Sequence, residues 1–407
     1  TVELAGLLRE DRMDELRKFR EQTREWLETN CPQAARGPGY VPIGSRSVDL
    51  HPELRLWLER MIEKGWTVPT WPKKFGGAGL GNDEYRILIE EIKRIDARPP
   101  LTGRGVNYIG PTILELGTDE QKARWLPICA RGEGAWAMGY SEPGAGSDLA
   151  SLSTRADKHG DQYWLNGRKT WTSDASYCDY IFVLARTSPQ KPKHEGISLI
   201  LVDMHQEGVS VSPIPLLSGA SPFCETVFED AVASSEDIIG GVDNGWNVGK
   251  RLLQFERSTH AGINISGSQG GLTQDSRLPD LVKKYVGTSD GVVSDFAIRE
   301  RLLKYEMNTK SQQITQRRAI EELEARAPAF TSSAVKLTNA LNIQAGDEIL
   351  MDAMGPSGYR WDTESGATEK ELEALRSWLY QKSLTIAGGT KEIQLNIIAK
   401  RVLGLPD

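Results

Sequence analysis

One stretch decides how this chain is interpreted, and it reads Trp136-Ala-Met-Gly-Tyr-Ser-Glu-Pro-Gly-Ala-Gly-Ser-Asp148. It begins as a strand and opens into a loop. Pro143 fixes one turn, and the glycines that follow let the backbone approach a ligand closely. Ser147 and Asp148 add polar side chains beside backbone N–H donors, an arrangement that holds phosphate oxygens. The stretch predicts a dinucleotide or nucleoside diphosphate site, and an ordinary Gly/Pro surface turn is the alternative for Gly-Ala-Gly alone.

Composition narrows the class of protein. A chain of 407 residues with 39% hydrophobic residues is long enough for two or three domains with sizeable cores. A net charge of −7 argues against nucleic acid as the main partner. The histidines lack metal spacing, and four separated cysteines without a CxxC pair favour reduced thiols over a disulfide framework or a metal site: Cys31, Cys129, Cys178 and Cys224.

The same composition bears on location. No apolar run reaches the length of a membrane span, and the N-terminus lacks the basic and apolar halves of a signal peptide. We therefore expect no membrane insertion and a cytoplasmic protein. Because the sequence begins with Thr1, a lost targeting segment stays open.

The order of periodic segments predicts an α+β fold with three domains. Residues 1–130 show helical patterns and predict an N-terminal helical domain, with helices at 8–29, 52–64, 83–95, 110–116 and 119–130. Residues 131–240 show short strands and predict a small middle β-barrel or sandwich, with strands at 180–185, 196–202, 209–214 and 226–228. Residues 241–407 predict a C-terminal four-helix-bundle domain, with helices at 249–271, 294–325, 332–354, 369–380 and 390–403.

Within the middle domain, one dipeptide gives a strong local signal. Asn166-Gly167 stands between two aromatic-rich runs at 163–165 and 169–171. Asn-Gly adopts the positive φ angles of a type I′ turn, so we expect a tight hairpin at this point.

Three motifs resemble the acyl-CoA dehydrogenase family. Ser141 to Asp148 match its flavin-binding signature, a small hydroxyl residue followed by Glu-Pro-x-Ala-Gly-Ser-Asp. The second motif is Trp171-Thr172-Ser173, and the third is the C-terminal segment 386–394, Ile-Ala-Gly-Gly-Thr-Lys-Glu-Ile-Gln. The resemblance covers most of the chain and implies FAD as cofactor. It assigns flavin contacts to Met138, Tyr140, Ser141, Gly146, Ser147, Trp171, Ser173, Thr390 and Glu392.

Individual roles follow from the resemblance. The backbone at Met138 and Tyr140 would meet the edge of the flavin ring, and the Trp171 indole would lie along the ring, which suits a flat apolar surface. Ser173 would hydrogen-bond near the flavin N5, and Ser147 would contact both the flavin diphosphate and acyl-CoA. Thr390 would cap a helix that presents N–H groups to the nucleotide.

The catalytic base departs from the commonest family pattern. Many members carry a glutamate immediately before the Gly-Thr pair of the C-terminal motif, where this chain has Gly388. A minority place it on an earlier helix within Leu-x-x-Glu-Arg, which matches Leu253-Gln254-Phe255-Glu256-Arg257. We expect Glu256 to be the base and Arg257 and Gly388 to bind substrate, Gly388 through its N–H. The alternative for Glu256 is an exposed helical residue beside Arg257.

The activity implied is dehydrogenation of an acyl-CoA thioester to the trans-2-enoyl-CoA, in fatty acid or steroid side-chain degradation. Glu256 would remove the α-proton, hydride would pass to flavin N5, and electrons would go to an electron-transfer flavoprotein. Other chemistry on the same scaffold stays open, namely an oxidase, a desulfinase or a monooxygenase. So does a flavin-binding subunit of a heteromeric dehydrogenase.

The oligomeric state depends on two further motifs. Family members bind the adenine end of FAD partly through a neighbouring subunit, with Arg-x-x-Phe-Gly and Gln…Gly-Gly segments. The nearest segments here, Lys283 to Gly287 and Asp352 to Pro356, match them poorly, and lysine does not replace the arginine fork. A homo-oligomer, as dimer or tetramer, and a heteromer with a related chain both stay open. The sequence does not identify the acyl group.

Overall fold

The computed structural model describes residues 2–260, 278–324 and 331–406. The chain forms two compact units: unit 1 comprises Thr1–Pro213 and Phe223–Phe255, and unit 2 comprises Ile214–Pro222 and Glu256–Asp407. Each unit has its own buried apolar core.

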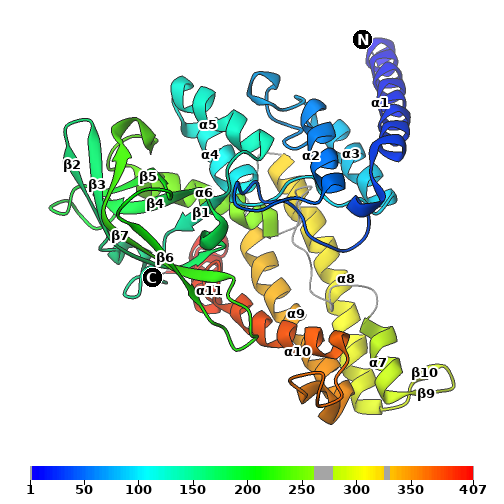
Figure 1. The fold of residues 1–407 in the computed structure, drawn as a ribbon. Coiled ribbons are helices and arrows are strands. Elements are labelled where there is room, and N and C mark those ends of the chain that lie inside the picture. The colour runs from blue at the N-terminus through cyan, green and yellow to red at the C-terminus, as the bar shows by residue number, and fades with distance from the viewer. Residues whose placement is uncertain (1, 261–277, 325–330, 407) are drawn as a thin grey trace. The chain divides into compact units, whose positions relative to one another are not determined.

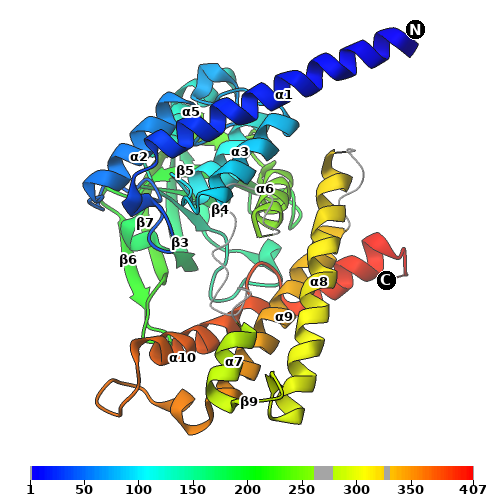
Figure 2. The same ribbon diagram turned by 90° about the vertical axis from the view of Figure 1, so that its right-hand side faces the viewer.

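Helices form the first part of unit 1 (Figure 1): α1 (Val2–Asn30), α2 (Pro52–Glu63), α3 (Asn82–Arg94), α4 (Gly110–Leu116) and α5 (Asp119–Arg131). They agree with the helices predicted, except that α1 begins earlier. The long helix α1 packs along α3 (Figure 2). Glu91, which is 1% exposed, ties the two helices by accepting hydrogen bonds from Arg20, Arg24 and Arg94. Led by Arg24, these guanidinium groups lower the pKa of Glu91 to about 2 against the effect of burial.

The second part of unit 1 is an eight-stranded sheet, made of β1 (Trp136–Gly139), β2 (Arg155–His159), β3 (Gln162–Ser173), β4 (Tyr180–Arg186), β5 (Ile197–Asp203), β6 (Val209–Ile214), β7 (Phe223–Ser234) and β8 (Ile238–Ile239). Its strand order is β6-β7-β3-β2-β4-β5-β8, and β1 pairs in parallel with β4. Central strands such as β4 and β5 are almost entirely buried, because both of their faces are covered. The predicted middle β domain is therefore present as this sheet.

The predicted hairpin at Asn166-Gly167 is wrong. Both residues lie inside β3, which runs on without a turn and pairs with β7, with a shift of register between Leu165 and Gly167. The Asn166 amide exchanges hydrogen bonds with Asp230 of the opposite strand at 2.8 and 2.9 Å. At Gly167 φ is +152°, and a Cβ there would lie 2.5 Å from the Thr154 hydroxyl. Glycine is required here by close packing at a bulge, not by a tight turn.

Helix α6 (Gly245–His260) belongs to unit 1 up to Phe255 and to unit 2 from Glu256. The rest of unit 2 consists of α7 (Leu278–Val286), a short hairpin of β9 (Thr288–Ser289) and β10 (Val292–Val293), α8 (Phe296–Glu324), α9 (Thr331–Met354), α10 (Glu369–Gln381) and α11 (Lys391–Ile397). Helix α9 packs against α7, α8, α10 and α11 (Figure 1). Within the described ranges, none of these helices is both long enough and apolar enough to cross a membrane.

Candidate functional site

The buried carboxylate of Glu142 holds the loop Ser141 to Asp148, which follows β1, in place. This residue is 6% exposed, and its carboxylate accepts hydrogen bonds from Ser153 N at 2.7 Å, Ser153 Oγ at 2.8 Å and Thr154 N at 2.9 Å. The loop also closes on itself, because Glu142 and Ala145 exchange both backbone hydrogen bonds. The segment that follows β1 therefore has a defined conformation and is not a loose surface turn.

Lys169 on β3 completes this arrangement. It is fully buried, and its Nζ lies 2.8 Å from Glu142 Oε1 and 3.1 Å from the Tyr140 carbonyl oxygen. One residue later, Thr170 N donates to the Ser141 carbonyl at 2.9 Å. Burial lowers the pKa of Lys169 to about 8, against the attraction of Glu142. Burial alone would raise the pKa of Glu142, but Lys169 and the loop donors hold it at about 2. These contacts place β3, which carries Trp171-Thr172-Ser173, beside the loop Ser141 to Asp148.

Trp171 stands in a strained position near the end of β3. Its φ is +61°, in the left-handed region that non-glycine residues avoid, and the β3–β7 pairing shifts between Lys169 and Thr172. The indole is 55% exposed and meets Phe223 edge-on, with ring centroids 5.9 Å apart. Such strain costs about 1–3 kcal/mol and is concentrated at ligand sites. The bulge holds a large flat apolar ring at the surface of unit 1.

The residues present fit a flavin. A Cβ on Gly144 or Gly146 would meet nothing within 4 Å, so the loop leaves open space on that side. Among the described residues, no hydrogen-bond partner is recorded for the hydroxyl groups of Ser141, Ser147 and Ser173, and all three residues are at least partly exposed. An exposed indole, three available hydroxyls and an open glycine loop suit a ligand with both a flat ring and phosphates.

The remaining predicted flavin residues of unit 1 are less accessible. Met138 lies in β1 opposite Phe182, and its side chain packs against the core. The Tyr140 ring is buried in the same core and meets Phe182 edge-on. The Tyr140 side chain is buried and that of Met138 is partly exposed, and the backbone contacts expected of these two residues stay predictions.

In unit 2 the structure brings Glu256 next to Gly388. Glu256 is 8% exposed, and its Oε1 lies 3.9 Å from the position that a Cβ on Gly388 would take. Gly388 has φ of +66°, a conformation that a side chain would strain. The alternative of an exposed Glu256 is thus wrong: its carboxylate lies beside the position where many family members carry their glutamate. The side chain of Arg257 lies outside the described residues.

The C-terminal glycine turn is held by two side chains. Lys336 of α9 donates from Nζ to the carbonyl oxygens of Gly389, at 2.6 Å, and Leu384, at 3.2 Å, and Gln394 donates to the Gly388 carbonyl at 3.1 Å. Thr390 caps α11, since its hydroxyl accepts from Ile393 N. In the described parts of the chain, no acceptor is recorded for the N–H groups of Gly388 and Gly389. Glu392 lies exposed in the first turn of α11.

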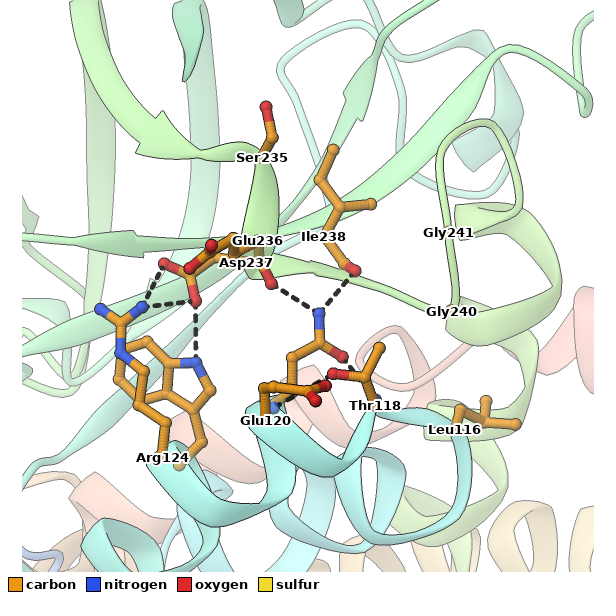
Figure 3. A pocket seen from close by; sticks show the side chains of 12 residues that line it. Leu116, Thr118, Glu120, Arg124, Ser235, Glu236, Asp237, Ile238, Gly240 and Gly241 are labelled. Carbon is orange, nitrogen blue, oxygen red and sulfur yellow. Dashed lines mark hydrogen bonds and ion pairs between the residues drawn. The ribbon is translucent and has the colours of Figure 1, made fainter. Parts of the chain in front are cut away.

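A cavity elsewhere in unit 1 does not contain these residues. It has a volume of about 580 Å³ and lies between the start of α5 and the segment from Ser235 to Gly241 (Figure 3). Asp237 accepts hydrogen bonds there from Trp125 and Arg124, and Gln121 donates to the carbonyls of Glu236 and Ile238. Burial raises the pKa of Asp237. The cavity marks the junction between the helices and the sheet, and no predicted site residue lines it.

Comparison with known proteins decides the family. Models of the acyl-CoA dehydrogenase N-terminal, middle and C-terminal domains match residues 13–133, 137–231 and 243–403. Acyl-CoA dehydrogenase IpdE1 of Mycobacterium tuberculosis is 34% identical over 401 residues, which are 97% of this chain and 99% of that protein. The chain belongs to the acyl-CoA dehydrogenase family. The predicted family, its α+β fold with helical outer domains and a middle β domain, and its oxidoreductase class are thereby confirmed.

Two solved structures of this family resemble the chain over nearly its whole length. One is titled Tcur3481-Tcur3483 steroid ACAD, with 27% identity, a TM-score of 0.76, and coverage of 97% of this chain and 98% of that chain. The other is the ChsE4-ChsE5 complex from Mycobacterium tuberculosis, with 26% identity, a TM-score of 0.70, and coverage of 97% and 98%. The acyl-CoA dehydrogenase family is a family of flavoproteins, which agrees with the fit of the unit 1 site to a flavin.

Sequence reasoning missed three residues of this site. Glu142 is one residue of the loop signature, and Lys169 is one residue of a predicted strand, so neither stands out in the sequence. Lys336 lies in no motif, and a lysine in a helix is ordinarily a solvated residue. Lys169 stands between Arg168 and Thr170, so its neighbours in the sequence give no sign that its side chain is buried.

Proposed function

We propose that this chain is the catalytic subunit of a FAD-dependent acyl-CoA dehydrogenase, with Glu256 as the base. The observation that supports this most is the position of its carboxylate, 3.9 Å from where a side chain on Gly388 would begin. A base supplied from α6 can then reach the region that a glutamate at position 388 would serve. The glycine at 388 leaves that region to Glu256.

The reaction removes the α-hydrogen of the thioester as a proton and the β-hydrogen as a hydride. Glu256 takes the proton, and its burial suits a general base because water does not compete for the substrate hydrogen. Negative charge develops on the thioester oxygen as the proton leaves, and the N–H of Gly388 stabilises it. Bound FAD would supply the hydride acceptor, since no side chain accepts hydride. An electron-transfer flavoprotein would serve as the electron acceptor of the loaded enzyme.

The residues that we assign to the cofactor are named here for each unit by itself. In unit 1 we assign ring contacts to the backbone at Met138 and Tyr140, to the Trp171 indole and to the hydroxyls of Ser141 and Ser173. Gly146 and Ser147 would hold the phosphates, and Ser147 would also contact acyl-CoA. In unit 2, Thr390 and Glu392 contribute at the start of α11, and Arg257 binds the substrate.

We further propose a ring-bearing, steroid-derived acyl group and a partner chain of the same family. The resemblance to a structure titled as a steroid ACAD with two named components, and to the ChsE4-ChsE5 complex, supports both points. The poor match of Lys283 to Gly287 and of Asp352 to Pro356 to the adenine-binding segments also supports a second chain, which would complete the FAD site.

The test is anaerobic mixing of the purified protein with acyl-CoA thioesters while flavin absorbance is followed. The protein is prepared alone and after co-expression with a related chain from its own source. We expect flavin in the co-expressed complex and bleaching by steroid-derived thioesters at least tenfold faster than by straight-chain ones. Full flavin content in the single chain would refute the heteromer. Bleaching by no thioester, or oxygen consumption or sulfite release in place of enoyl-CoA formation, would refute the dehydrogenase.

A further inference from the structure

We propose that Lys336 is a positioning residue that fixes the C-terminal glycine turn beside Glu256, so that the base meets the α-hydrogen while the Gly388 N–H meets the thioester oxygen of the same substrate. This inference rests on the function proposed above and adds a residue that the sequence motifs do not contain. All the groups involved belong to unit 2, so their arrangement does not depend on how the two units are placed.

The first argument is the hydrogen bonding of Lys336. Its ammonium group donates to two carbonyl oxygens on either side of the glycine turn, that of Leu384 at 3.2 Å and that of Gly389 at 2.6 Å. The side-chain amide of Gln394 donates to the Gly388 carbonyl oxygen at 3.1 Å. The carbonyl groups of both glycines are therefore hydrogen-bonded to side chains of the same unit. Because a peptide group is planar, holding the carbonyls of Gly388 and Gly389 fixes the N–H groups of Gly389 and Thr390, and Gly388 itself lies between held positions at Leu384 and Gly389.

The second argument is the neighbourhood of Gly388. Both Lys336 Cε, at 3.7 Å, and Glu256 Oε1, at 3.9 Å, lie within 4 Å of the point where a side chain on Gly388 would begin. A lysine stem and a carboxylate oxygen thus share the space that the missing side chain leaves. Burial lowers the pKa of Lys336, and attraction to Glu256 opposes that shift, which agrees with a cation placed beside the base.

The third argument is the fold of α9. Lys336 lies between Val335 and Leu337, which are both buried, so its backbone is held in the core of unit 2. A lysine that is only half-buried, yet makes charge-assisted bonds to backbone carbonyls, is a strong local constraint. The hydrogen bonds constrain the turn and the charge of Lys336 attracts the carboxylate, which favours alignment of the base with the oxyanion donor.

The test compares Lys336→Met, which keeps the stem and removes the ammonium group, with Lys310→Met, which removes an exposed lysine of α8 in the same unit. Lys336→Arg, which keeps the charge, serves as the rescue variant. Each is measured as the flavin-loaded protein, with its partner chain where one is needed, by anaerobic flavin reduction across substrate concentrations. Amide hydrogen exchange of the segment 384–391 is measured in the same samples without substrate, and melting temperature and flavin content are recorded.

We expect Lys336→Met to lower the maximal rate of flavin reduction at least tenfold with KM changed less than twofold. Exchange in the segment 384–391 rises at least tenfold, Lys336→Arg recovers part of both, and Lys310→Met changes neither. A rate within twofold of the wild type would overturn the proposal, as would a loss that only parallels a loss of folded protein. If none of the thioesters reduces the flavin of the wild type, the proposed function fails. Separately, unchanged amide exchange of the segment 384–391 in Lys336→Met would overturn the anchoring of the turn.

Discussion

Breaking the buried pair of Lys169 and Glu142 should destabilise unit 1 and release its flavin. The Lys169 side chain is fully buried and that of Glu142 is 4% exposed, with 2.8 Å between Nζ and Oε1. Lys169→Met leaves a buried carboxylate without its cation. Removing one member of such a pair costs about 3–5 kcal/mol, because the remaining charge stays out of water.

The double variant Lys169→Met/Glu142→Gln separates this effect from a general loss of packing. Neutralising both partners removes the isolated charge, and the amide oxygen of the introduced glutamine replaces one acceptor for the Ser153 and Thr154 donors. We expect the double variant to regain about 2 kcal/mol relative to the sum of the two single changes. Lys193→Met is the matched control, since it breaks an ion pair with Asp148 of the same loop in which the two side chains are 44% and 65% exposed, so that water screens the charges.

The assay is urea unfolding followed by tryptophan fluorescence, because most of the 11 tryptophans precede residue 256. With an m-value of about 3 kcal/mol/M, Lys169→Met should lower the midpoint by about 1 M or more. Flavin content after purification should fall with it, because Nζ also holds the Tyr140 carbonyl. Equal midpoints for Lys169→Met and Lys193→Met, or single effects that simply add in the double variant, would refute this reasoning.

Three further predictions concern unit 1. The free energy of unfolding should fall as the pH drops from about 4.5 to 2, because the pKa values of Glu91 and Glu142 are about 2 in the folded chain and 4.5 in the unfolded one. The loss is on the order of 3 kcal/mol for each group. An acid titration followed by circular dichroism that shows no transition in this range would contradict the prediction. Trp171→Gly should leave the urea midpoint unchanged or raised, since it removes strain of about 1 kcal/mol or more, while flavin retention falls at least tenfold; full retention on a desalting column would argue against the ring contact. Gly167→Ala should lower the free energy of unfolding by about 2 kcal/mol because its Cβ would collide with Thr154, whereas a wild-type urea midpoint would show that the bulge adapts.

Much of the fold follows from local patterns. Amphipathic spacing locates α2, α3 and α5 to within a residue or two at each end, and capping residues such as Thr118 and Thr368 mark where helices begin. The hairpin expected at Asn166-Gly167 fails because the turn preference of Asn-Gly is overridden by two long-range contacts, with Asp230 and with Thr154. Propensity is local, and those contacts are not.

The candidate site divides in the same way. Residues in contiguous motifs, such as Ser141 to Asp148 and Glu256, could be recognised from the sequence. Lys169 and Lys336 could not, because their roles depend on partners that lie 27 and more than 45 residues away. The same limit applies to the acyl group, since the shape of a pocket depends on side chains from several helices.

The claim that Glu256 is the base is tested most directly by Glu256→Gln, compared with Glu306→Gln, which changes an exposed glutamate of α8 in the same unit. Both variants are loaded with FAD, matched for flavin content and mixed anaerobically with the best thioester substrate. We predict that Glu256→Gln slows flavin reduction by about 100-fold or more while Glu306→Gln reacts as the wild type does. Reduction by Glu256→Gln within twofold of the wild-type rate, at equal flavin content, would contradict the account.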